Sequence, residues 1–136
     1  MQKKKLVLIT GCNGGIGTIL CEKFAEADFL VIGSDLHEVK SAECDLYLQC
    51  DLEKFPQNKE LQSAFQLSVF DFMASYSAQL KVLINNAAYQ VVKELDTLSV
   101  EEFNKSLNSN DIELKLIVLF SFISSNLFLI NSLASL

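Results

Sequence analysis

The stretch LVLITGCNGGIG, residues 6–17, joins an apolar run to a turn that contains four glycines. An unbroken run of leucine, valine and isoleucine is typical of a strand that is buried on both faces of a parallel sheet. Glycine permits positive φ angles and lets the backbone approach a ligand closely. A helix that starts directly after such a turn offers free N–H groups and the positive end of its dipole to an anion. The stretch therefore predicts a strand, a phosphate-binding turn and a helix.

The rest of the chain alternates between helical and strand patterns. A first helix is predicted over residues 16–27, because its apolar residues recur at helical spacing. They are Ile16, Leu20, Phe24 and Ala27, with Ile19 beside them. The later elements are predicted as strands over residues 29–33, 46–50 and 81–84, a helix over residues 58–77, and a fifth strand near residues 127–131. In the sequence SVEE, Ser99 and Glu102 form a capping box, which opens another helix.

This alternation predicts an α/β protein. Strands that alternate with helices form a parallel sheet with helices on both faces. We expect a Rossmann-type, doubly wound sheet of about five strands in three α/β/α layers. The chain shows no internal repeat, low-complexity tract or linker, so residues 1–136 are predicted to form a single domain.

The glycines follow the pattern T-G-x-x-x-G-x-G, with fixed positions at Gly11, Gly15 and Gly17. A strand precedes them, a helix follows, and an acidic residue ends the next predicted strand. A glycine turn in that setting is a site for the pyrophosphate of a dinucleotide. The residues of the turn expected to contact this cofactor are Gly11, Asn13, Gly14, Gly15, Ile16 and Gly17.

The turn and three later stretches resemble the classical short-chain dehydrogenase/reductase family. TGCNGGIG resembles the cofactor loop of that family, and NNAA, residues 85–88, resembles its N-N-A-G motif with Ala88 in place of glycine. SVEEFNKSLNSN resembles the start of the helix that follows and ends on the structural asparagine of the family, Asn110. The resemblance covers residues 3–110, the N-terminal cofactor-binding portion of the family.

The resemblance also implies cofactor contacts outside the turn. Asp51 and Leu52 fall where the family has an aspartate that touches the adenine. Asn85, Asn86 and Ala87 belong to the second motif and are predicted to line the cofactor site. Two alternatives stay open: Asp51 is also a residue that ends a strand in a turn, and the two asparagines also suit a role in tying adjacent strands together.

Asp35 follows the second predicted strand and bears on the choice of cofactor. A carboxylate there accepts hydrogen bonds from both adenosine ribose hydroxyls and repels a 2′-phosphate, which favours NAD over NADP. The sequence contains no arginine, the usual phosphate ligand, although Lys40 is a substitute cation. The alternative for Asp35 is a solvent-exposed turn residue.

For catalysis, the resemblance implies a serine, followed on a later helix by a tyrosine and a lysine four residues apart. The tyrosine exchanges a proton with the substrate oxygen, and the lysine lowers the pKa of the tyrosine. LINSLAS, residues 129–135, resembles the serine-bearing strand, so Ser135 is assigned as catalytic together with Asn110, with Ser132 as the alternative serine. The sequence ends at residue 136 without that later helix.

The implied activity is hydride transfer between NAD(H) and an alcohol/carbonyl pair, which we expect to be impaired in this truncated chain. The pair Tyr89 and Lys93, directly after the NNAA stretch, has the family spacing, but coincidence is the favoured interpretation because matches of two residues at this short spacing are common by accident. A non-catalytic dinucleotide-binding remnant or interaction module is the alternative function. An exposed apolar sheet edge would favour a homo-oligomer.

Composition excludes other classes. A net charge of −6 without arginine argues against a nucleic-acid partner. Four cysteines without a C-x-x-C pair and a single histidine give no zinc ligand set and indicate reduced thiols in the cytoplasm. The last 21 residues, 116–136, carry no charge and are long enough to span a membrane. Seven of them are serine or asparagine, which disfavours that alternative.

Overall fold

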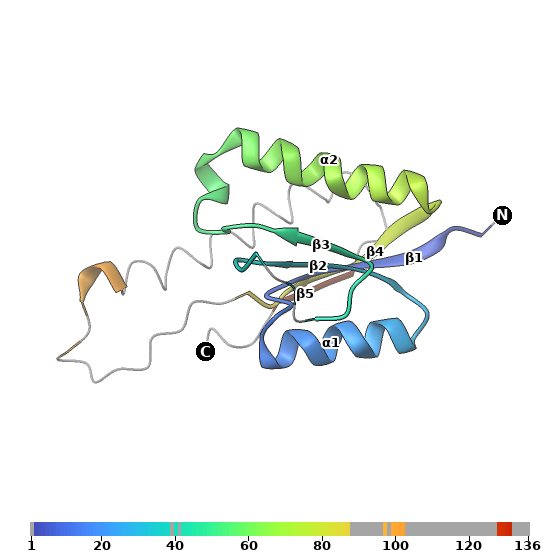
Figure 1. Cartoon of the computed structure of the whole chain (residues 1–136), viewed down its shortest axis with the longest axis horizontal. Helices are drawn as coiled ribbons and strands as arrows, with labels where there is room; N and C mark the ends of the chain where they lie inside the picture. Colours follow the sequence, from blue (N-terminus) through green and yellow to red (C-terminus); the bar gives the residue numbers. More distant parts are fainter. Residues whose placement is uncertain are drawn as a thin grey trace.

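The computed structural model of the chain describes residues 2–38, 40, 42–87, 97, 99–102 and 128–131. These residues contain one sheet of parallel strands, with a helix on each face (Figure 1). The elements are β1 (Lys4–Thr10), α1 (Gly15–Glu26), β2 (Leu30–Asp35), β3 (Leu46–Gln49), the 3₁₀ helix η1 (Phe55–Gln57), α2 (Lys59–Ser75), β4 (Ala78–Asn85) and β5 (Phe128–Asn131). The predicted α/β class is confirmed.

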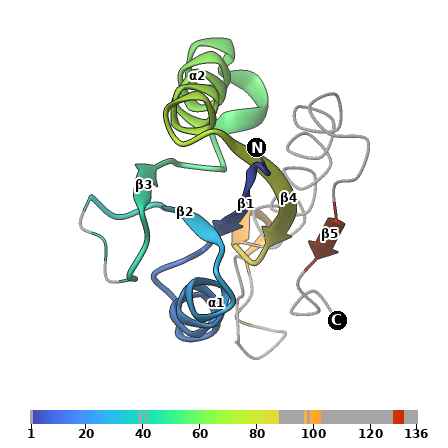
Figure 2. The same cartoon turned by 90° about the vertical axis from the view of Figure 1, so that its right-hand side faces the viewer.

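The strand order is β3-β2-β1-β4-β5. The chain therefore winds outward from β1 to β3 and then crosses back to pair β4 on the other side of β1 (Figure 2). This arrangement is the doubly wound topology, in which ligands bind where the direction of winding reverses. Here that point lies between the carboxyl ends of β1 and β4. β5 pairs in parallel with β4, which confirms the predicted fifth strand.

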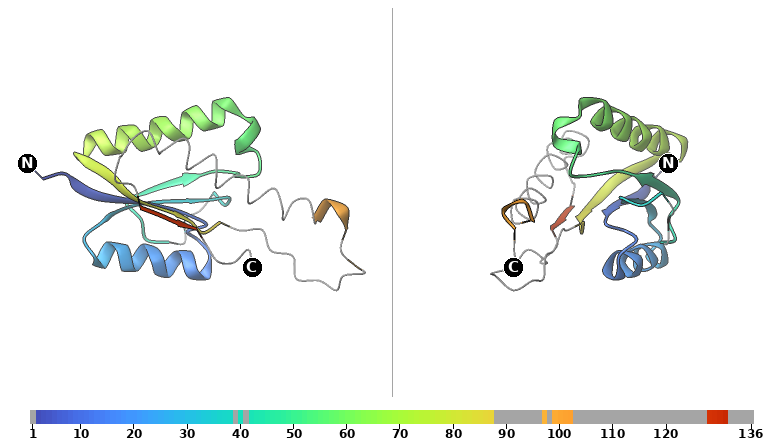
Figure 3. Two further views of the ribbon diagram at one scale, coloured as in Figure 1. Left: turned by 180° about the vertical axis from the view of Figure 1, so that it is seen from behind. Right: turned by 60° about the vertical axis from the view of Figure 1, so that its left-hand side comes forward.

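β1 occupies the centre of the sheet, and its apolar run is buried on both faces, as predicted. Leu6 and Leu8 pack into a cluster beneath α2, whereas Val7 and Ile9 pack into a second cluster beneath α1. Burial of each such side chain stabilises the fold by roughly 1.5–3 kcal/mol. The two helices lie on opposite faces, and the N-terminus projects from the edge away from the glycine turn (Figure 3).

Helix α1 follows its prediction in part: Leu20 and Phe24 pack against the core cluster beneath it, as expected, but its N-terminal isoleucines do not. Ile16 and Ile19 were expected on the apolar face, but they are 63% and 57% exposed. The helix instead buries Gly17 and Cys21. The reason is steric: a Cβ atom at Gly17 would lie 2.1 Å from the carbonyl oxygen of Gly11, so only glycine lets the helix approach the turn this closely. That approach fixes the rotation of the helix.

Several boundaries also moved. β4 begins at Ala78 rather than residue 81, because Ala78 and Leu80 are buried and pair with β1 although the polar Gln79 stands between them. β2 ends at Asp35, as predicted, and pairs there with β3. The predicted capping box is confirmed, since Ser99 N donates to Glu102 Oε2 and Glu102 N donates to Ser99 Oγ, each at 3.1 Å.

No helix in the described part of the chain is both long and apolar enough to cross a membrane. Within residues 116–136, the disfavoured alternative of a membrane span, Phe128–Asn131 form a strand, which contradicts a helix running through all of them. The other residues of that span lie outside the described ones. The expected homo-oligomer and cytoplasmic location stay predictions.

Candidate dinucleotide site

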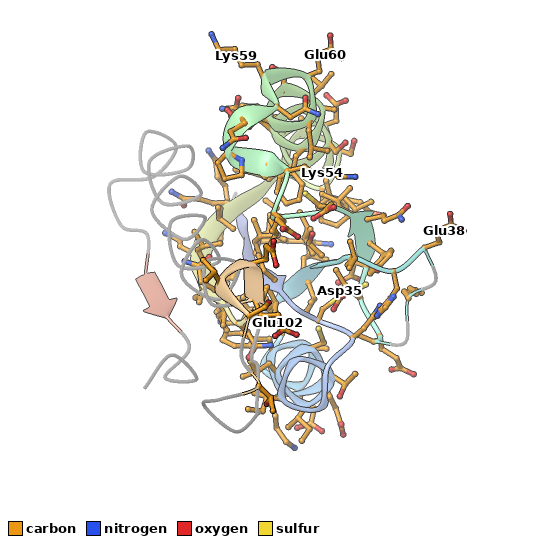
Figure 4. The ribbon with its side chains drawn as sticks, turned by 90° about the vertical axis from the view of Figure 1, so that its left-hand side faces the viewer. Asp35, Glu38, Lys54, Lys59, Glu60 and Glu102 are labelled. Atoms are coloured by element: carbon orange, nitrogen blue, oxygen red, sulfur yellow. The ribbon has the colours of Figure 1, made fainter. Side chains whose placement is uncertain are left out.

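The predicted cofactor residues that the structure describes come together at the carboxyl edge of the sheet. The glycine turn leaves β1, Asp35 ends β2, and Asn85 ends β4. Figure 4 looks onto this edge, with Asp35 between α1 and α2. Because all five strands are parallel, their carboxyl ends meet at one edge, which is where open α/β sheets bind ligands.

Two of the glycines are required by the fold itself. Gly11 has a φ of +65°, and a Cβ atom there would lie 2.8 Å from Ala87 Cα. At Gly17, a Cβ atom would lie 2.1 Å from the carbonyl oxygen of Gly11. Any side chain at either position would force backbone atoms apart, so these residues hold the turn against β4 and α1.

The other two glycines leave open space. A Cβ atom at Gly15 would meet nothing within 4 Å, and one at Gly14 would meet only the Gly11 carbonyl oxygen, at 3.5 Å. Gly14 is also the N-cap of α1, and no side chain caps the helix there. The first turn of α1 contains no acidic residue. An uncapped helix start beside bare backbone is a cradle for an anion. These residues fit the pyrophosphate of a dinucleotide.

Thr10 joins the turn to the end of β4. Its buried hydroxyl donates to the Ile84 carbonyl oxygen at 3.4 Å and accepts from the backbone N–H groups of Asn86 and Ala87, each at 3.1 Å. Asn86 Nδ2 in turn donates to the Gly11 carbonyl oxygen at 3.1 Å. Asn86 thus ties adjacent strands together, the alternative left open above, and the same bonds place it beside the turn.

Asp35 is bound to the turn. Its Oδ2 accepts from Asn13 N at 2.9 Å, and its Oδ1 accepts from Leu36 N at 2.7 Å. Each carboxylate oxygen has a second acceptor position. The carboxylate is therefore held in place beside the turn and can accept further hydrogen bonds, as a ribose diol requires.

Asp51 makes local contacts that fit its alternative as a turn residue. Its Oδ1 accepts from Glu53 N at 3.1 Å, and its Oδ2 lies 3.6 Å from Lys54 Nζ. Leu52 packs against the cluster beneath α2. Both residues follow β3, at the same edge of the sheet as the glycine turn. Contact of either with an adenine stays a prediction.

The structure does not describe the predicted catalytic residues. Asn110 and Ser135, the alternative Ser132, and the pair Tyr89 and Lys93 all lie outside the described residues. Lys40 is described, and its Nζ donates to the Cys44 carbonyl oxygen at 3.4 Å. No metal-binding group of histidine, cysteine or acidic residues is found in the described part of the chain.

The cysteines are free thiols, and Cys12, Cys21 and Cys50 are buried. Burial, helped by the nearby Asp51 charge, raises the pKa of Cys50 to about 11, so this thiol stays protonated at neutral pH. Cys12 fills the space above Gly33, where a Cβ atom would lie 2.8 Å from its Sγ. The sequence predicted neither this contact nor the bond between the Tyr47 hydroxyl and Asn13. Neither contact has a signal in the local sequence pattern.

A doubly wound parallel sheet with a glycine turn between its first strand and first helix defines a fold of the Rossmann type. A family model described as short chain dehydrogenase matches residues 5–113, and the chain belongs to that family. This confirms the family resemblance.

Two curated relatives are similar over most of the chain. The diacetyl reductase [(S)-acetoin forming] of Staphylococcus epidermidis is 28% identical over 116 residues, covering 78% of this chain and 42% of the reductase. The NADP-dependent (R)-specific alcohol dehydrogenase of Lentilactobacillus kefiri is 27% identical over 109 residues, covering 79% of this chain and 43% of that enzyme. The chain therefore spans less than half the length of these relatives.

Solved structures share the fold. The ligand-free aldohexose dehydrogenase of Thermoplasma acidophilum matches with a TM-score of 0.71 and 21% identity, over 95% of this chain and 49% of its own. A short chain dehydrogenase from Leptospira borgpetersenii with bound NAD+ matches with a TM-score of 0.64 and 27% identity, over 89% of this chain and 44% of its own.

Proposed function

We propose that this chain binds NAD(H) and serves hydride transfer between an alcohol and a carbonyl compound. The observation that carries the proposal is the open cradle at Gly14 and Gly15, at an uncapped helix start, with the Asp35 carboxylate bound to the same turn. The cradle suits the pyrophosphate, and the carboxylate suits the adenosine ribose. Residues proposed to line the site are Gly11, Asn13, Gly14, Gly15, Ile16, Gly17, Asp35, Asp51, Leu52, Asn85, Asn86 and Ala87.

We propose NAD rather than NADP as the cofactor. A 2′-phosphate would place its negative charge beside the Asp35 carboxylate, and the chain has no arginine to offset it. The Leptospira borgpetersenii structure with bound NAD+ supports this choice. The Lentilactobacillus kefiri relative is NADP-dependent, so both cofactors must be tested.

The nicotinamide of the bound cofactor would accept or donate the hydride. We assign the catalytic roles to Ser135, which would orient the substrate oxygen, and to Asn110. Neither of the described tyrosines, Tyr47 and Tyr76, has a lysine four residues later. The second candidate function is binding of the dinucleotide without turnover.

A titration followed by nicotinamide fluorescence tests the cofactor site. We expect NADH to bind more tightly than NADPH, and Asp35→Asn to reduce the difference because the repelling charge is gone. Absence of NADH binding at millimolar concentration would contradict both candidate functions.

Turnover with a panel of secondary alcohols then separates the two candidates. Reduction of NAD would support the oxidoreductase, whereas binding without turnover would support the second candidate. Loss of that activity in Tyr89→Phe would show that the Tyr89 and Lys93 pair is catalytic and not a coincidence.

A further inference from the structure

Asn13, in the glycine turn, connects the turn to three separate parts of the fold. Its backbone N–H donates to Asp35 Oδ2 at 2.9 Å, and its Nδ2 donates to the hydroxyl of Tyr47 at 3.1 Å. Its Oδ1 accepts from Ala42 N at 3.3 Å. One side chain therefore links the turn to β3 and to the connection between β2 and β3.

Tyr47 stands opposite Gly33 in the pairing of β3 with β2. Its ring packs against the cluster beneath α1, and its hydroxyl reaches past the end of β2. There the hydroxyl accepts from Asn13 and donates to the His37 carbonyl oxygen. Burial raises the pKa of Tyr47 above its ordinary value, so the hydroxyl keeps the proton that it donates.

These bonds join residues that lie next to the Asp35 carboxylate. Asn13 lies on one side of it, in the turn, and Leu36 and His37 follow it in the chain. Tyr47 bonds to Asn13 and to His37, and Gln49 Nε2 adds a bond to the Leu36 carbonyl oxygen at 3.2 Å. The Tyr47 hydroxyl on β3 thus connects Asn13, in the turn, to His37, in the segment that follows Asp35.

We propose that Tyr47 is a positioning residue of the cofactor site, whose hydroxyl holds Asn13 and His37 in the arrangement that presents the Asp35 carboxylate to the adenosine ribose. The inference rests on the proposed function, because the ribose is that of NAD(H). Tyr47 touches no cofactor atom in this proposal and acts through Asn13 and His37.

The test compares the full chain with Tyr47→Phe and the matched control Tyr76→Phe. Tyr76 lies at the other end of the sheet, as the C-cap of α2, and is 47% exposed. The centroid of its ring lies 4.6 Å from that of Phe72. Kd values are measured for NADH by fluorescence and for AMP, which carries the same ribose, by calorimetry. The unfolding temperature is measured without ligand.

Tyr47→Phe is expected to weaken NADH and AMP binding by roughly fivefold each, the size of one net hydrogen bond. Its unfolding temperature should stay within about 4 °C of the wild type. Tyr76→Phe should leave both Kd values unchanged. A merely structural role for Tyr47 predicts the reverse, with a lower unfolding temperature and unchanged Kd values.

A double-mutant cycle with Asn13→Ala supplies the second variant. If Tyr47 acts through Asn13, its substitution should add less than its full effect in the Asn13→Ala background. Full additivity, or Kd values that Tyr47→Phe leaves at the wild-type level, would overturn the inference while the proposed function stands. Failure of the wild type to bind NADH would instead contradict the proposed function, and the inference with it.

Discussion

The two helices that cover the sheet are built in opposite ways. α2 packs through large side chains, Phe65, Val69 and Phe72, and its first turn is capped by the side chain of Asn58. α1 packs through Gly17 and Cys21, and no side chain caps its start. α2 therefore packs with large side chains and has a capped N-terminus. α1 packs with small residues, and the N–H groups of its first turn have no side-chain cap.

The difference separates stability from binding. Large apolar side chains bury the most surface, so the residues of α2 contribute more apolar burial to the core than those of α1 do. A bare helix start next to glycines is poor for stability, because its N–H groups have no capping side chain. It is the arrangement that an anion needs. Substitutions of the buried residues of α2 should therefore change stability, and those at the open positions Gly14 and Gly15 should change cofactor affinity.

Phe65→Ala should have the largest effect. Phe65 is buried and meets the ring of Phe55 edge-on, with 5.7 Å between the ring centroids. Truncation of a buried phenylalanine lowers the free energy of unfolding by about 3–5 kcal/mol. Urea denaturation measures the loss. A decrease below about 1 kcal/mol would contradict the assignment of this face as the main core.

Gly17→Ala should lower the free energy of unfolding by about 3 kcal/mol, because the new methyl group forces backbone atoms apart. Its Cβ would lie 2.1 Å from the Gly11 carbonyl oxygen and 2.8 Å from Cys12 Cα. The same urea experiment applies. A stable Gly17→Ala variant would show that the contact between α1 and the turn is looser than described.

Gly15→Ala is the matched control for Gly17→Ala, with the opposite expectation. Its Cβ meets no protein atom within 4 Å, so the free energy of unfolding should be unchanged or rise by up to about 1 kcal/mol. The methyl group occupies the proposed pyrophosphate cradle, and NADH should bind roughly tenfold more weakly, about 1.4 kcal/mol. Fluorescence titration measures this. Unchanged affinity would place the pyrophosphate elsewhere.

Asn58→Ala should have the smallest effect. Asn58 Oδ1 accepts from Leu61 N at 3.0 Å, and loss of such a cap costs about 1 kcal/mol. Thermal unfolding should show the decrease, while the Kd for NADH stays at the wild-type value. A change in NADH affinity would show that the N-terminus of α2 influences the cofactor site at the N-terminus of α1.

Much of the fold follows from local patterns. The apolar run of β1, the glycine turn and the Ser99 capping box each act through neighbouring residues, and all three appear as predicted. The buried face of α1 was predicted only in part, since Leu20 and Phe24 pack against the core as expected. Apolar spacing favoured Ile16 and Ile19, but the helix turns Gly17 inward because no other face comes as close to the turn.

Part of the site could also be predicted, because glycines and Asp35 mark the ends of adjacent strands. The bonds made by Tyr47 could not, since 34 residues separate it from Asn13. Their contact depends on the pairing of β3 with β2 and on the space at Gly33, where a Cβ atom would lie 2.8 Å from Sγ of Cys12, the residue before Asn13. Hydrophobic periodicity carries no information on either condition.

The sequence by itself determined the α/β class, the glycine turn between the first strand and the first helix, and the acidic residue at the end of the second strand, because each depends on neighbours along the chain. The tertiary structure decided which glycines are required by packing and which leave space for an anion. It also decided that Tyr47 reaches Asn13 across the sheet. These features depend on distances between atoms far apart in the chain, which only strand order and register set.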